Sequence, residues 1–248
     1  AQDGTGEETR LTTDGNVYRF GLLWSPDSRA ILYTDASMHL WMVTIADKKP
    51  VLVDRSTIGQ VPLGKWSADS KWIAYSKPTP GFLSSLYLYS VDKKRVYPIT
   101  TGRFNDREPV FDQNGKYLYF ISDRTFVPHL PGPEPGINFQ NTAQIYALTL
   151  QNDTLSPLSP ESDEEKPKEE EKPKAEEKPK TDPQKAATPA TTPASPEMKV
   201  DIEGLSDRII TLPTPPGNYQ GLSAGTGVAY FTNNGTLSQF SVASKQVT

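Results

Sequence analysis

The sequence contains no cysteine and only two histidines, and these shortages exclude several kinds of site at the outset. Without cysteine there is neither a disulfide framework nor a thiolate nucleophile. His39 and His129 are too few for the usual zinc sites, which draw several ligands from histidine and cysteine. The sequence therefore predicts no metal site and no bound cofactor.

The chain also lacks a long apolar run and a basic stripe. No stretch approaches the length needed to cross a bilayer, so no membrane partner is expected. The net charge is −4, which argues against nucleic acid as the main partner. The N-terminal residues 1–4 do not resemble a signal peptide, and a cytoplasmic location is expected. A periplasmic one stays open, because a removed signal peptide would leave no trace.

What the chain does have is a repeated ten-residue segment. It occurs as Trp24–Tyr33, Trp66–Tyr75 and Phe111–Phe120, at offsets of 42 and 45 residues. Each copy has an aromatic residue, a turn rich in Ser, Asp, Asn or Gly, and an apolar run typical of a strand. A fixed period of about 40–50 residues is typical of stacked or radial repeats.

Each repeat extends into further strands with alternating apolar residues, such as 39–43, 85–89 and 144–148. Four strands at this period predict an all-β fold, a β-propeller of four-stranded antiparallel blades. About four blades are present, which we interpret as part of a six- or seven-bladed propeller. In the alternative, Arg10–Thr12 pairs beside the C-terminal strand and closes a small ring. Trp24, Trp66 and Phe111 are expected at equivalent positions between blades.

A fourth copy follows a long interruption. Arg208–Pro213 matches Arg95–Thr100, which is the fourth strand of the second repeat, and Leu222–Thr232 falls in the register of Trp24–Thr34. The third blade is therefore predicted to be interrupted between its third and fourth strands. This divides the chain into blades one to three (1–150), an insertion (151–206), and the end of blade three with blade four (207–248).

The insertion is rich in lysine, glutamate and proline. Nine of the 23 prolines lie between 155 and 200, and residues 161–185 contain ten acidic and seven basic residues without an aromatic one. Such a segment buries too little apolar surface to offset its ordering entropy. We expect it to be disordered, either a tolerated insertion or a docking tail.

Few residues are candidates for chemistry. Gly221–Gly225 fits the G-x-S-x-G nucleophile motif around Ser223, but that motif requires a following helix, and a strand-like run follows here. The alignment places Ser223 in the turn after the first strand. His39 and His129 lack companions at a diagnostic spacing. No catalytic residue is predicted.

Two further groups have alternative interpretations. Asp112–Gly115 begins like a calcium loop, but the pattern does not continue, so a hairpin turn is expected. Arg103, Arg107 and Arg124 cluster around the third repeat. They are either solvated surface charges or channel-facing groups that hold a peptide carboxylate.

The turn that contains Trp24–Ser28 resembles the TolB-type propeller repeat. Two blocks sharpen the resemblance: 106–112 with 115–124, and 201–208 with Leu212-Pro213 and 215–219. Together with the charged insertion between them, they resemble the second propeller of bacterial tricorn-like proteases.

This resemblance implies a noncatalytic β-propeller that guides or gates oligopeptides toward a serine peptidase site outside the chain. The implied partners are oligopeptide substrates, the other domains of the peptidase, and further copies in a homo-oligomer. The competing hypothesis is a free-standing protein-interaction propeller that uses the insertion as a docking arm.

Overall fold

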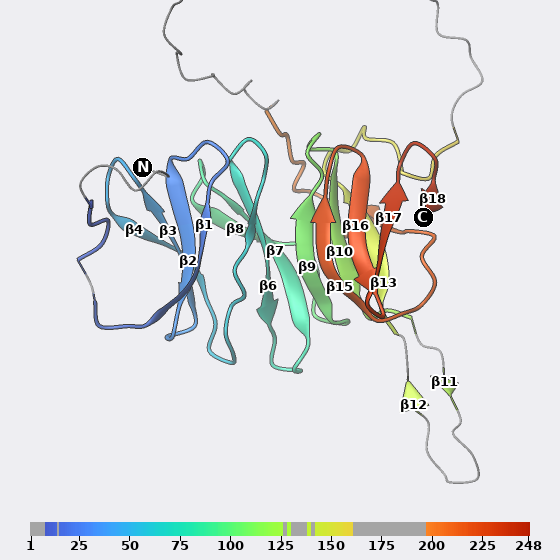
Figure 1. Ribbon diagram of the computed structural model, residues 1–248, viewed down its shortest axis with the longest axis horizontal. Coiled ribbons are helices and arrows are strands. Elements are labelled where there is room, and N and C mark those ends of the chain that lie inside the picture. Colours follow the sequence, from blue (N-terminus) through green and yellow to red (C-terminus); the bar gives the residue numbers. More distant parts are fainter. Residues whose placement is uncertain (1–7, 14, 126–127, 130–137, 140–141, 161–196) are drawn as a thin grey trace, which may run out of the picture.

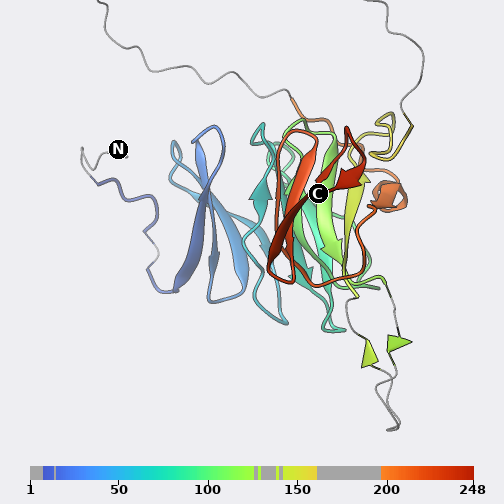
Figure 2. The same ribbon diagram turned by 45° about the vertical axis from the view of Figure 1, so that its right-hand side comes forward.

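Four antiparallel sheets of four strands each stand side by side in the computed structural model (Figures 1 and 2). The structure describes residues 8–13, 15–125, 128–129, 138–139, 142–160 and 197–248. Each sheet is one predicted blade, which confirms the all-β propeller architecture.

The four blades have the following strands. Blade one contains β1 (Arg19–Trp24), β2 (Ala30–Asp35), β3 (His39–Thr44) and β4 (Pro50–Arg55). Blade two contains β5 (Lys65–Trp66), β6 (Trp72–Pro78), β7 (Ser84–Ser90) and β8 (Arg95–Pro98). Blade three contains β9 (Asp106–Phe111), β10 (Tyr117–Ser122), β13 (Gln144–Thr149) and β14 (Ile209–Thr211). Blade four contains β15 (Tyr219–Ala224), β16 (Val228–Asn233), β17 (Thr236–Ser241) and β18 (Gln246–Val247).

Three smaller elements lie outside the blades. Between β10 and β13 the strands β11 (Pro128–His129) and β12 (Asn138–Phe139) pair with each other. A 3-10 helix, η1 (Leu205–Arg208), precedes β14. Within the described part of the chain, no helix is long and apolar enough to cross a membrane.

Blade three is interrupted where the repeat register predicts. Its third strand β13 pairs antiparallel with β14, bringing Tyr146 opposite Thr211 across more than sixty residues of sequence. The intervening residues 161–196 lie outside the described residues, so the expected disorder there stays a prediction.

The ends of the insertion differ from the expectation of disorder over 151–206. Met198 is buried, and Val200 and Ile202 pack with it against the core between blades two and three. Leu205 on η1 is buried in the same core. The composition of the whole insertion obscured these four apolar side chains, which are enough to hold its C-terminal end.

The hydrophobic cores lie between blades. One joins blades one and two, a second joins blades two and three, and a third joins blades three and four. The three repeat aromatics have equivalent positions in the register, opposite Ile31, Ile73 and Leu118. Their burial differs, however: Phe111 is 5% exposed, whereas Trp24 is 54% exposed and so is not packed between blades as predicted. Strand β9 contacts both neighbouring blades, whereas β1 at the edge of the arrangement contacts mainly β2 of its own blade.

The turn after the first strand explains the repeated sequence. Ser25 Oγ donates a hydrogen bond to Asp27 Oδ1 at 2.6 Å and accepts one from the Ala30 amide at 2.9 Å. Ser67 makes the same bonds with Asp69 and Trp72 in blade two. The hydroxyl thus caps the turn and the start of the next strand.

Blade four departs from the predicted alignment at this turn. The amide of Ser25 bonds to the carbonyl five residues ahead, whereas the Gly225 amide bonds to Val228, three residues ahead. Gly225, not Ser223, therefore occupies the position of Ser25. The turn is two residues shorter, while β16 keeps the predicted register.

The small-ring alternative does not match this arrangement. Strand β18 pairs only with β17 among the described strands. The N-terminal residues lie against blade one instead, where Leu11 packs on Ile31 and Tyr33, and Arg19 donates a hydrogen bond to Thr12 Oγ1.

Candidate functional site

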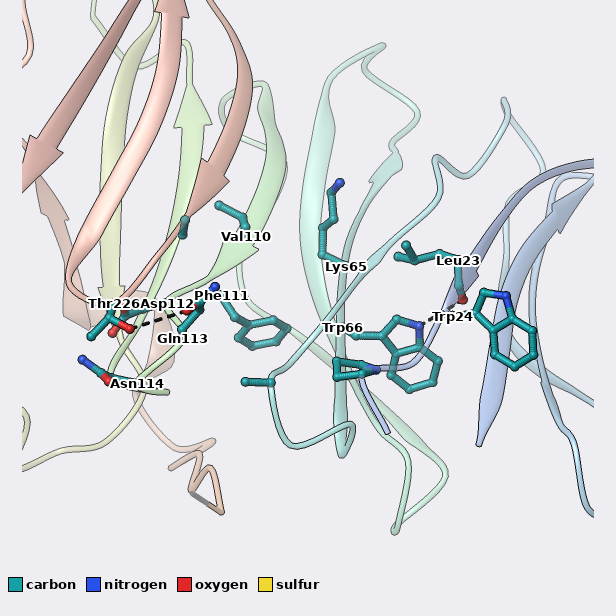
Figure 3. Close-up of a pocket in the computed structure, with 13 residues that line it drawn as sticks. Leu23, Trp24, Lys65, Trp66, Val110, Phe111, Asp112, Gln113, Asn114 and Thr226 are labelled. Atoms are coloured by element: carbon teal, nitrogen blue, oxygen red, sulfur yellow. Dashed lines mark hydrogen bonds between the residues drawn. The ribbon is translucent and has the colours of Figure 1, made fainter. Parts of the chain in front are cut away.

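The first strands of the four blades enclose a cavity of about 720 Å³ (Figure 3). Every blade contributes to its wall, which consists of Leu23, Trp24, Pro26, Lys65, Trp66, Ala68, Val110, Phe111, Asp112, Gln113, Asn114, Ala224 and Thr226. The volume falls in the range of about 300–1,000 Å³ that is usual for ligand pockets.

Aromatic and aliphatic side chains dominate this cavity. Trp66 lies partly buried, and its indole Nε1 donates a hydrogen bond to the carbonyl of Leu23 at 3.4 Å, which links blades two and one. Phe111 closes the side toward blade three. Trp24 exposes about half of its surface, so a large apolar face is open to a guest.

Polar groups of the same wall are mostly engaged. Asp112 is 1% exposed, and its Oδ1 accepts a hydrogen bond of 2.7 Å from the Gly227 amide, which joins blades three and four. Burial raises the pKa of Asp112, and the hydrogen bond from Gly227 opposes that rise without cancelling it.

A second cavity of about 590 Å³ is lined by residues of blades two, three and four, and Lys65 lines both cavities. Arg107 and Glu108 belong to its wall. Arg107 forms an ion pair with Asp123, with Nη1 and Oδ1 2.8 Å apart. Glu108 Oε2 accepts a hydrogen bond of 3.0 Å from the Leu222 amide on β15.

Glu108 stands at a strained backbone position. Its φ is 51°, in the left-handed region that disfavours side chains other than glycine. The corresponding bulges of blades one and four have Gly21 and Gly221 at similar φ values. The hydrogen bond from the Leu222 amide to Glu108 joins β9 to β15. This contact between blades offsets the backbone strain at Glu108.

The predicted catalytic candidates are not brought together. Ser223 is exposed on β15 opposite Tyr230 of β16, so a strand follows the motif and the nucleophile geometry is absent. His39 Nδ1 lies 3.2 Å from Asp35 Oδ2, which also accepts a bond from Trp41 Nε1. His129 belongs to β11, and its side chain lies outside the described residues.

The three arginines have different environments. Arg124 is neither channel-facing nor a solvated charge: its guanidinium stacks over Phe120 and Tyr146 and pairs with the buried carboxylate of Asp106. Arg103 is exposed, beside a small hollow near Phe104. Arg107 alone reaches the channel-side cavity.

The Asp112–Gly115 segment forms the expected hairpin turn. The Gly115 amide donates to the Asp112 carbonyl at 2.9 Å, and Gly115 has φ of 68°. Over the residues that the structure describes, no group of three or more His, Asp or Glu side chains is arranged to hold a metal ion.

Comparison with known proteins agrees with this architecture. The family described as the tricorn protease second beta propeller domain matches residues 1–247. "Tricorn protease homolog 1" of Streptomyces coelicolor is 34% identical over 229 residues, which are 88% of this chain and 19% of that protein. The "Tricorn protease homolog" of Saccharolobus solfataricus is 27% identical over 195 residues, 79% of this chain and 15% of that protein.

Solved structures show the same fold. The crystal structure of the tricorn protease superposes with a TM-score of 0.72 at 18% identity, covering 94% of this chain and 22% of that one. TolB from Acinetobacter baumannii superposes with a TM-score of 0.51 at 13% identity, covering 93% and 43%. The chain spans about a fifth of the length of the curated relatives.

Proposed function

We propose, from the premise that this chain belongs to the family of tricorn protease second β-propeller domains, that it guides or gates oligopeptide substrates of a tricorn-like serine peptidase. In this role the chain is noncatalytic, and the active site lies outside it. The proposal includes the other domains of the peptidase as partners and a homo-oligomeric assembly.

The observation that supports guidance most directly is the composition of the cavity wall. All four blades present their first strands there, with apolar side chains and few charged groups. An extended peptide placed along these strands would contact aromatic rings and backbone groups, an arrangement that suits many sequences. Chemistry is not supported, because the described residues bring no histidine to Ser223.

Peptide binding by the chain itself tests the proposal first. Isothermal titration calorimetry with oligopeptides of five to ten residues should give weak, saturable binding, and a fluorogenic peptide library should show no hydrolysis. Ser223→Ala should change neither result. Specific labelling of Ser223 by a fluorophosphonate probe, or an absence of any peptide binding, would contradict the proposal.

Gating is tested in the full-length protease. Ala68 lines the cavity, so Ala68→Trp should fill part of it and slow hydrolysis of oligopeptides, while very short substrates should be hydrolysed at the original rate. Ala46→Trp is the matched control, because Ala46 is exposed in the turn after β3. Equal effects of the two variants would show that the cavity has no part in substrate access.

A further inference from the structure

One position of the repeat carries a charge in a single blade. The residue immediately before the repeat aromatic is Leu23 in blade one, Lys65 in blade two and Val110 in blade three, and by the corrected register Ser223 in blade four. Leu23, Lys65 and Val110 line the cavity together. In Figure 3 the side chain of Lys65 extends between Leu23 and Val110.

Lys65 is also the charged group that the surroundings leave without a partner. Among the other charged residues of the two cavities, Asp112 is bonded to Gly227, Arg107 to Asp123, and Glu108 to Leu222. Lys65 Nζ has no hydrogen bond or ion pair with any residue that the structure describes. Of the two cations in these walls, Arg107 is therefore paired and Lys65 is not, while the carboxylates of Asp112 and Glu108 accept hydrogen bonds from amides and have no ion pair among the described residues.

The side chain of Lys65 is exposed to solvent. Leu23, Val110 and Trp66 line the larger cavity with it, and Trp24 offers a half-exposed face there. Lysine buries its methylene groups along apolar surface while keeping its ammonium accessible. A peptide that lies along this wall would cover part of the lysine and so strengthen its interaction with an anion.

We infer that Lys65 recognises a carboxylate of the oligopeptide, and that the apolar side chain next to that carboxylate lies against Trp24, Trp66 and Phe111. The inference rests on the proposed function, because it assigns a chemical preference to the same cavity. The carboxylate comes either from the peptide C-terminus or from an acidic side chain, and both present the same group to the ammonium.

Three matched peptides separate these sources: one with a C-terminal phenylalanine and a free carboxylate, its C-terminal amide, and the amide with aspartate before the phenylalanine. Calorimetry with the full chain should show the free acid binding about two- to fivefold tighter than the plain amide, as for an ion pair at an exposed site. If the aspartate-containing amide binds more tightly than the plain amide, a side-chain carboxylate is also a ligand.

Variants of Lys65 test whether this residue causes the preference for the free acid over the amide. Lys65→Met should abolish the difference between acid and amide with little change in the affinity of the amide, and Lys65→Arg should retain the difference. Lys49→Met is the control, because Lys49 is exposed in the turn between β3 and β4. A thermal melt of each variant verifies folding.

The outcomes are distinguishable from those that test guidance. If no peptide binds, the proposed function fails. If peptides bind the wild-type chain but acid and amide bind equally, or if Lys65→Met keeps the preference, the proposed function stands and the recognition of carboxylate by Lys65 is refuted.

Discussion

Replacing Met198 with alanine should destabilise the whole propeller, although this residue belongs to the end of the charged insertion. Its side chain is 7% exposed and packs against Gly115, where an added Cβ would lie 2.9 Å from Met198 Cγ. Its amide donates a hydrogen bond of 2.8 Å to Asp69 Oδ2. Met198 thereby joins the strand-one turns of blades two and three.

The corresponding junction of blades one and two explains why this contact is needed. There Ser70 Oγ accepts a hydrogen bond of 3.1 Å from the Asp27 amide. Gly115 takes the place of Ser70 in blade three and has no side chain to offer. The insertion end supplies the missing contact from a distance of about eighty residues in sequence.

The size of the effect follows from the burial. Truncating a buried methionine to alanine typically costs about 2–5 kcal/mol. For a domain of about 150–250 residues, each kcal/mol lowers Tm by about 2–4 °C, so a loss of about 4–20 °C is expected. Calorimetric melts of the wild type, Met198→Ala and the exposed neighbour Lys199→Ala measure it, and Lys199→Ala should lie within about 0.5 kcal/mol of the wild type.

A double-mutant cycle tests the contact between Met198 and Gly115 directly. Gly115→Ala should be destabilising in the wild type, because of its positive φ and the clash with Met198. The Met198→Ala background removes the 2.9 Å approach to Cγ and leaves the backbone strain and a 3.3 Å approach to Cβ, so the cost of Gly115→Ala should be smaller. A Tm of Met198→Ala within a degree of the wild type, or additive effects in the cycle, would refute the reasoning.

Three further predictions concern the cavity wall and its support. Phe111→Ala should cost about 3–5 kcal/mol in chemical denaturation, whereas Trp24→Ala, at a half-exposed site, should cost much less; equal costs would contradict the burial difference. Because burial raises the folded-state pKa of Asp112, its contribution to stability falls as pH rises through the unfolded-state value of about 3.9 toward the raised folded-state value. The stability of the wild type relative to Asp112→Asn should therefore be greater at pH 3 than at pH 7, and denaturant melts across that range would expose the opposite trend. Arg124→Met leaves the carboxylate of Asp106, 1% exposed, without its cation and should cost about 3–5 kcal/mol, part of which Asp106→Asn in the same chain should restore.

The blade architecture could be predicted because its signals are local. In blades one and two a hydroxyl and a carboxylate two residues apart specify the turn, and each strand is specified by alternation, so one repeat can be aligned on the next. The match of Arg208–Pro213 to Arg95–Thr100 even located β14, which pairs with β13 as predicted. The same local signals say nothing of a two-residue change in turn length, and Ser223 was misplaced for that reason.

The insertion end could not be predicted, because its order depends on contacts made across the chain. Met198, Val200, Ile202 and Leu205 are separated by polar residues, and the composition of the segment is that of a disordered chain. The space left by Gly115 and the acceptor offered by Asp69 give Met198 its place, and the core between blades two and three contains the other three side chains. The order of the C-terminal end of the insertion therefore depends on the assembled blades.

Some features of the candidate site could be predicted from local sequence signals, and others depend on contacts across the chain. In blades one to three the repeat aromatic and the residue before it line the larger cavity, whereas the sequence placed the aromatics between blades and offered only arginines as channel-facing groups. The sequence does not tell which cations of the cavity walls are paired: Arg107 has a partner in Asp123, while Lys65 has none among the described residues. The proposed partner of this exposed lysine is the carboxylate of a bound peptide. The carboxylate preference of the wild type and its loss in Lys65→Met therefore test the position in the repeat and the free charge together.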